Sequence, residues 1–103
     1  MNKAKDSKPK GKKYWFTYAF LTREGQPNPV HRERNFTRWH GQISTLLSDL
    51  TRAMSSETWS KGAYVVTIWP GQIDEWQALH GAAMPLYNIY EGSTTRGPQI
   101  ERI

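Results

Sequence analysis

The chain has 103 residues, a formal net charge of +5 and no cysteine. This length suits a single domain with a small hydrophobic core, and the lack of cysteine excludes disulfides, thiolate metal sites and a cysteine nucleophile. No apolar run approaches the roughly 20 residues that span a bilayer, and no apolar segment follows the basic N-terminus as a signal peptide requires. We therefore expect a cytoplasmic protein with no membrane partner.

The N-terminal lysines carry the whole excess charge. Residues 1–13 contain six lysines against one aspartate, whereas residues 14–103 hold eight basic and eight acidic residues. Repulsion between the lysines predicts a disordered tail. Because lysine neutralises phosphates without contacting bases, we expect this tail to bind nucleic acid non-specifically; the alternative is that it only keeps the protein soluble. The candidate residues are Lys3, Lys5, Lys8, Lys10, Lys12 and Lys13.

Three segments predict strands. Residues 14–21, YWFTYAFL, are rich in aromatic side chains and contain neither Gly nor Pro. Residues 63–69, AYVVTIW, are apolar and β-branched, and residues 86–90, LYNIY, form a shorter strand of the same kind. Residues 30–36 alternate only weakly, which fits either a charged edge strand or an extended loop.

A helix over Phe36–Met54 organises the predicted fold. Its apolar residues recur at spacings of three and four, which places them on one helix face. They are Trp39, Ile43, Leu46, Leu47, Leu50 and Met54. A shorter helix is expected within residues 72–80, where the acidic pair Asp74 and Glu75 would favour the helix dipole rather than act in general acid–base catalysis.

These elements predict an α+β fold, a small two-layer sandwich in which one sheet of three or four strands carries a single long amphipathic helix on one face. The predicted domain spans residues 14–91. Residues 92–103 contain Gly, Ser, Thr and Pro, and we expect them to form a loose C-terminal tail. The pattern resembles small accessory proteins of bacteriophages and mobile elements, which implies binding to a host or viral macromolecule.

Arg32, Arg34 and Arg38 form a second basic group just before the predicted helix. If residues 30–36 are a strand, Arg32 and Arg34 project on the same face. Guanidinium groups beside aromatic rings can hold phosphate, stack on bases or anchor a protein partner. The alternative is a solvated edge with one Arg–Glu pair.

The sequence contains no motif of catalysis or cofactor binding. His31, His40 and His80 lack the spacing of metal ligands, and no phosphate-binding glycine loop is present. We therefore expect no enzymatic activity, no cofactor and no metal. The second hypothesis is a protein-interaction module, a regulator or inhibitor of a larger complex, that binds through exposed members of its five Trp and five Tyr residues.

Overall fold

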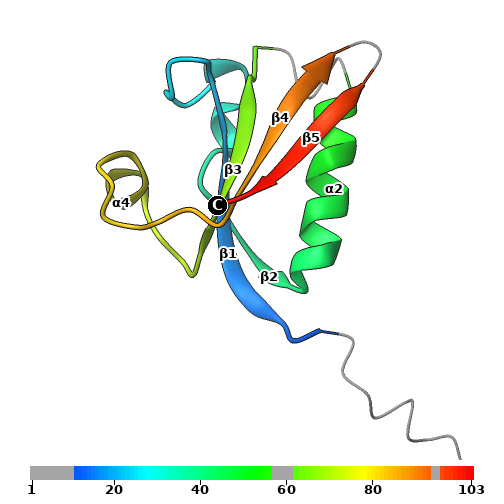
Figure 1. Ribbon diagram of the computed structural model, residues 1–103. Helices are drawn as coiled ribbons and strands as arrows, with labels where there is room; N and C mark the ends of the chain where they lie inside the picture. Colours follow the sequence, from blue (N-terminus) through cyan, green and yellow to red (C-terminus); the bar gives the residue numbers. More distant parts are fainter. Residues whose placement is uncertain (1–10, 57–61, 94–95) are drawn as a thin grey trace, which may run out of the picture.

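The computed structural model describes residues 11–56, 62–93 and 96–103. It contains a five-stranded antiparallel sheet in the order β2-β1-β3-β4-β5, with one main helix, α2, packed against it (Figure 1). The strands are β1 (Tyr14–Leu21), β2 (Thr37–Gly41), β3 (Val65–Pro70), β4 (Tyr87–Ser93) and β5 (Gly97–Arg102). The helices are the 3₁₀ helix η1 (Pro29–Arg34), α2 (Ile43–Ser55) and α4 (Glu75–Leu79). The predicted α+β architecture, with a long helix on one face of one sheet, is confirmed.

Apolar side chains lie on both faces of the sheet, which explains why β1 is apolar on both sides. Phe16 and Phe20 point toward α2 and join a buried cluster with Leu46. Ala19 lies on the opposite face in a second cluster with Trp69. β1 and β3 are therefore central strands with a core layer on each side. None of the helices in the described residues has the length and apolar composition of a membrane-spanning helix.

The main helix begins at Ile43, so the prediction that it starts at Phe36 is wrong. Residues 37–41 form β2 instead, and Trp39 lies opposite Phe16 on β1. Trp39 still packs against the same core as Ile43. The helical spacing thus arose from two consecutive elements that cover one core. Gly41 makes room for this arrangement, because a Cβ there would lie 2.5 Å from the Trp39 ring.

The expectation that residues 92–103 form a loose tail is wrong for residues 97–102, which form β5 and pair with β4. Glycine turn chemistry supports this hairpin. Gly92 and Gly97 both have positive φ, and a Cβ at Gly92 would overlap the Gly97 carbonyl. Gly92 and Ser93 therefore end β4 and Gly97 begins β5, and the sheet has five strands rather than three or four.

Residues 29–34 form η1 rather than the edge strand that was one of two expectations for this region. The residues on either side of η1 nevertheless supply hydrogen-bond partners to the part of β1 that extends past β2. The Phe20 N–H donates to Asn35 Oδ1 at 2.8 Å, and the Asn28 N–H donates to the Phe20 carbonyl at 2.9 Å. Asn35 Nδ2 in turn donates to the Asn28 carbonyl at 3.1 Å. Two asparagines thus take the place of a strand and satisfy backbone groups that would otherwise be buried without partners.

Candidate nucleic-acid interface

The N-terminal lysines lead directly into the sheet. Lys3, Lys5, Lys8 and Lys10 lie outside the part of the chain that the structure describes. Lys12 and Lys13 are exposed and immediately precede β1. Gln42 Nε2 donates to the Gly11 carbonyl at 3.1 Å, which holds this stretch beside the junction of β2 and α2.

The three candidate arginines do not share one surface. Arg34 lines a groove between η1 and α2, and Arg32 lines a different cavity of about 350 Å³ together with Glu75. Arg38 lies on β2 opposite Thr17. The expectation that Arg32 and Arg34 share one face fails, because it required a strand where the chain forms a 3₁₀ helix. Of the three, only Arg38 lies on β2, next to β1.

An exposed aromatic pair lies beside Arg38. Trp15 and His40 are directly opposite each other in the antiparallel register, and their ring centroids are 5.1 Å apart. Trp15 keeps 44% of its surface exposed, and His40 and Arg38 are exposed as well. Strand alternation places Arg38 on the same face as His40, and the exposed Lys13 lies one residue before β1. We call these four residues the β1–β2 surface; it alternates cations with rings.

Sequence reasoning missed the pairing of Trp15 with His40. A signal was present, because alternation along residues 37–41 puts Arg38 and His40 on one face of an extended segment. Assigning these residues to the helix concealed it. Recognising the pair also requires the register between β1 and β2, which no local pattern supplies.

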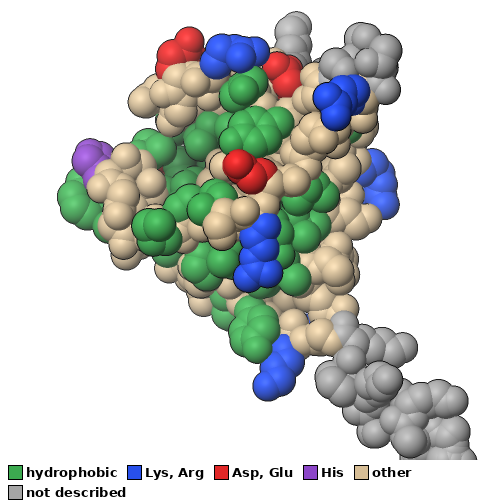
Figure 2. Space-filling model, viewed as in Figure 1, with side chains coloured by type: hydrophobic (Ala, Val, Ile, Leu, Met, Phe, Trp, Pro, Cys, Tyr) green, Lys and Arg blue, Asp and Glu red, His purple; other side chains and the backbone are tan. Residues whose placement is uncertain are grey.

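The remaining cations of the body are dispersed. Figure 2 shows one face of the molecule, on which hydrophobic side chains occupy much of the centre and Lys and Arg side chains appear singly. Arg23 illustrates this, since it lies over the Tyr64 ring at 4.1 Å and pairs with Glu91 at 3.4 Å. On the face in view, the charge pattern thus lacks a continuous basic patch.

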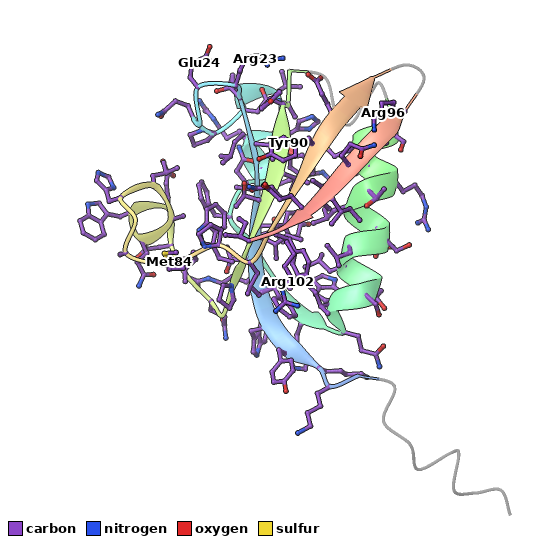
Figure 3. The ribbon with its side chains drawn as sticks, viewed as in Figure 1. Arg23, Glu24, Met84, Tyr90, Arg96 and Arg102 are labelled. Atoms are coloured by element: carbon purple, nitrogen blue, oxygen red, sulfur yellow. The ribbon has the colours of Figure 1, made fainter. Side chains whose placement is uncertain are left out.

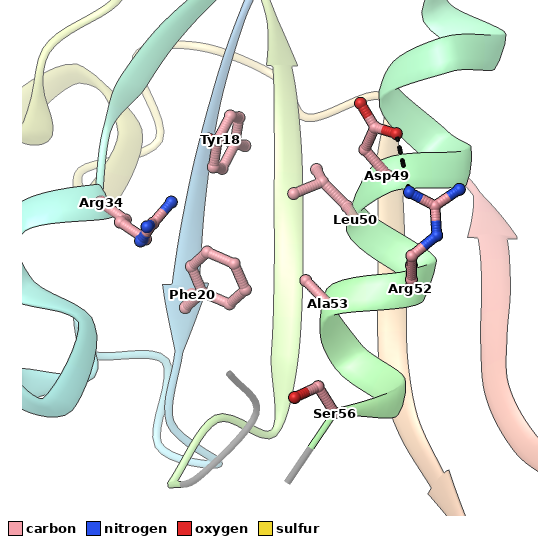
Figure 4. A pocket seen from close by; sticks show the side chains of 8 residues that line it. All are labelled: Tyr18, Phe20, Arg34, Asp49, Leu50, Arg52, Ala53 and Ser56. Carbon is pink, nitrogen blue, oxygen red and sulfur yellow. Dashed lines mark ion pairs between the residues drawn. The ribbon is translucent and has the colours of Figure 1, made fainter. Parts of the chain in front are cut away.

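A groove of about 460 Å³ lies between η1 and α2, above β1 (Figure 4). Tyr18 and Phe20 form its floor, with ring centroids 6.1 Å apart in an edge-to-face arrangement. Arg34 lies on the η1 side, while on the α2 side Arg52 pairs with Asp49 at 3.5 Å. The groove is therefore apolar at its base, and its α2 rim carries a neutralised ion pair.

Each of the three histidines has a distinct environment. His31 is buried against Phe20, with ring centroids 5.1 Å apart, and His40 belongs to the β1–β2 surface. His80 stacks on Trp76 at 4.9 Å. In the described ranges, no group of three or more His, Cys, Asp or Glu side chains could hold a metal ion.

The acidic pair at the start of α4 has a structural role. The Asp74 carboxylate accepts from the Gln77 N–H at 2.8 Å, and the Gln77 side chain accepts from the Asp74 N–H at 2.9 Å. This capping box satisfies backbone donors at the helix start. The explanation of Asp74 and Glu75 as residues that favour a helix N-terminus agrees with this geometry.

Acid is expected to destabilise the fold through His31. Burial is the main cause that lowers the pKa of His31, and the charge of Arg34 adds to it. Since the folded pKa is lower than the unfolded one, the unfolded chain binds more protons between the two values. Neutral His31 therefore makes its full contribution to the free energy of unfolding above about pH 6.5, the ordinary pKa of histidine. This contribution is lost as the pH falls toward the pKa of His31 in the folded protein.

Urea unfolding at about pH 7.5 and about pH 5.5 measures this loss. His31→Phe keeps a ring against Phe20 and should reduce the difference between the two pH values. An unchanged difference in the variant would contradict the assignment to His31.

Comparisons with protein-family models, with curated proteins and with solved structures find no match.

Proposed function

We propose that the protein binds nucleic acid through its N-terminal lysines and the β1–β2 surface acting together. The observation that carries this proposal is the exposed Trp15–His40 pair. Trp15 lies two residues after Lys13, and His40 lies two residues after Arg38. Lysines that neutralise phosphates supply affinity without base readout. Aromatic rings interleaved with cations suit unpaired bases, which stack on rings irrespective of sequence. The ligand that fits best is thus a single strand.

The main helix gives no support to base-specific recognition. Its exposed positions include Ser44, Thr45 and Ser48, and Arg52 is paired with Asp49. A helix that reads a major groove presents basic and amide side chains to the bases. The proposed binding is therefore non-specific, with affinity from phosphate contacts and stacking.

Salt dependence tests the phosphate contacts. The six N-terminal lysines are replaced with glutamine, which keeps the chain length, and binding of a labelled single strand is measured by fluorescence anisotropy between about 50 and 200 mM salt. The slope of log K against log salt is expected to become shallower by up to about 4, because each phosphate contact on a single strand contributes roughly −0.7.

Arg23→Gln is the matched control, since Arg23 lies at the opposite end of β1 from Lys13 (Figure 3). This change should alter the slope by less than about 1. Absence of binding by the wild type at low salt, or a slope that the lysine substitutions leave unchanged, would contradict the proposal.

Protein interaction is the second candidate function, and exposed apolar residues near α4 favour it. This helix projects away from the sheet (Figure 1). Trp76 on α4 is 63% exposed, and Met84 in the following loop is 74% exposed. Because α4 projects away from the sheet that contains β1 and β2, Trp76→Ala separates the two candidates: it should weaken a protein contact at α4 and leave nucleic-acid binding unchanged.

A further inference from the structure

β5 is an edge strand with one side of its backbone available. Within the described ranges, β5 pairs only with β4. The Ile103 N–H donates to the Leu86 carbonyl at 2.8 Å. Because hydrogen-bonded and non-hydrogen-bonded pairs alternate in an antiparallel ladder, residues 99, 101 and 103 direct their backbone groups toward β4. The groups that point outward are the N–H and C=O of Ile100 and Arg102 and the C=O of Pro98.

An apolar side chain marks this edge. Ile100 lies opposite Ile89, which is fully buried under α2. Ile100 itself remains 50% exposed, so the apolar layer on the helix face ends in contact with water. A hydrophobic side chain on a regular edge strand is a common site of strand addition.

We infer that β5 pairs with β5 of a second copy of this chain, antiparallel and about a two-fold axis at Ile100. In this register Ile100 meets Ile100 of the second copy on the helix face, and their N–H and C=O groups bond reciprocally. The Arg102 N–H donates to the Pro98 carbonyl of the other copy. Pro98 lacks an N–H, so no outward donor is left without an acceptor.

The side chains of the other face also fit this register. It places Gln99 opposite Glu101 of the second copy, and an amide can donate to a carboxylate. The Glu101 carboxylate is already held by the Tyr90 hydroxyl at 3.0 Å and by Asn88 Nδ2 at 3.2 Å. An axis at Glu101 would instead put two carboxylates directly opposite each other, which is destabilising.

The other edge of the sheet is unsuited to pairing between two copies. β2 contains the exposed Arg38, and its Gly41 end lies opposite Tyr14, next to Lys12 and Lys13. A second copy paired there would bring like charges together. Pairing through β5 leaves the β1–β2 surface free, because β2 and β5 are opposite edges of the sheet. A two-fold axis perpendicular to the sheet also keeps both copies of α2 on one face.

Molar mass measured by sedimentation across protein concentration tests the inference. The wild-type mass is expected to rise from that of one chain toward twice that value. Ile100→Lys places two ammonium groups at the axis and is expected to raise the dissociation constant at least about tenfold. Because Ile100 is half exposed, lysine should be tolerated by the fold, and the circular dichroism spectrum and melting temperature verify this. Met84→Lys, at a position 74% exposed, is the matched control and should dimerise like the wild type.

A disulfide provides a second readout, since the chain has no cysteine of its own. Hydrogen-bonded antiparallel pairs have Cα atoms about 5.5 Å apart, within the range that a disulfide spans. Ile100→Cys is expected to form a disulfide-linked, reducible dimer under mild oxidation, whereas Met84→Cys should form no disulfide-linked dimer. A single-chain mass up to about 1 mM protein, or a dimer that Ile100→Lys does not weaken, would overturn the inference.

Discussion

Replacing Trp15 with alanine is expected to weaken single-strand binding by about tenfold to a hundredfold. Stacking of a base on an aromatic side chain contributes roughly 1–3 kcal/mol, and each 1.4 kcal/mol is a factor of about ten. Binding to duplex should change by less than about threefold, because paired bases cannot stack on the ring and the lysines still contact phosphates. Anisotropy titrations with a single strand and its duplex measure both affinities.

Two variants control this prediction. Trp76→Ala removes a Trp that is more exposed than Trp15 but lies on α4, and it should leave both affinities unchanged. Trp15→Phe retains a ring opposite His40 and should restore most of the single-strand affinity. If Trp15→Ala leaves single-strand binding unchanged, Trp15 is not a stacking platform.

Asn35→Ala is expected to lower the free energy of unfolding by about 1–3 kcal/mol, the cost of leaving a buried backbone donor without an acceptor. Phe20 is 1% exposed, so water cannot readily replace the Asn35 Oδ1 atom that its N–H contacts at 2.8 Å. The substitution also removes the contact from Asn35 Nδ2 to the Asn28 carbonyl. Chemical denaturation followed by circular dichroism measures the change.

Gln99→Ala is the matched amide control. Its side chain is exposed on β5 and donates to the nearby Gly97 carbonyl at 3.4 Å. Its loss should cost less than about 0.5 kcal/mol at protein concentrations where the chain is monomeric. A similarly small effect of Asn35→Ala would contradict the role of asparagine in completing the edge of β1.

Local composition was sufficient to predict the central elements. β1 and β3 are continuous apolar or aromatic runs, and the spacing of Leu46, Leu50 and Met54 located the buried face of α2. These elements form the core, where side-chain pattern and burial coincide. The same apolar runs and helical spacing also predicted that a single helix packs against one sheet.

β2 and β5 could not be predicted in this way, for different reasons. β2 is short, and Trp39 continued the helical spacing because it covers the same core as α2. In β5, residues 99–102 are all exposed, so its sequence lacks the alternation of a half-buried strand. Its place in the sheet depends on pairing with β4, which is a tertiary contact.

The candidate site was predicted only in part. Composition alone located Lys12 and Lys13, because the excess charge is confined to one end of the sequence. Grouping Arg32 with Arg34 failed since it depended on a strand. The pairing of Trp15 with His40 depends on the register of two strands that are far apart in the chain, so only the structure reveals it.

Mapping the contact by photo-cross-linking tests the central claim most directly. A single strand that contains 5-bromouracil is irradiated with the wild-type protein, and the tryptic peptides are identified by mass spectrometry. The adduct is expected on peptide 14–23, in which Trp15 is the sole Trp, and it should be lost in Trp15→Ala. An adduct confined to peptides outside β1 and β2, such as the one that contains Trp76, would contradict the account.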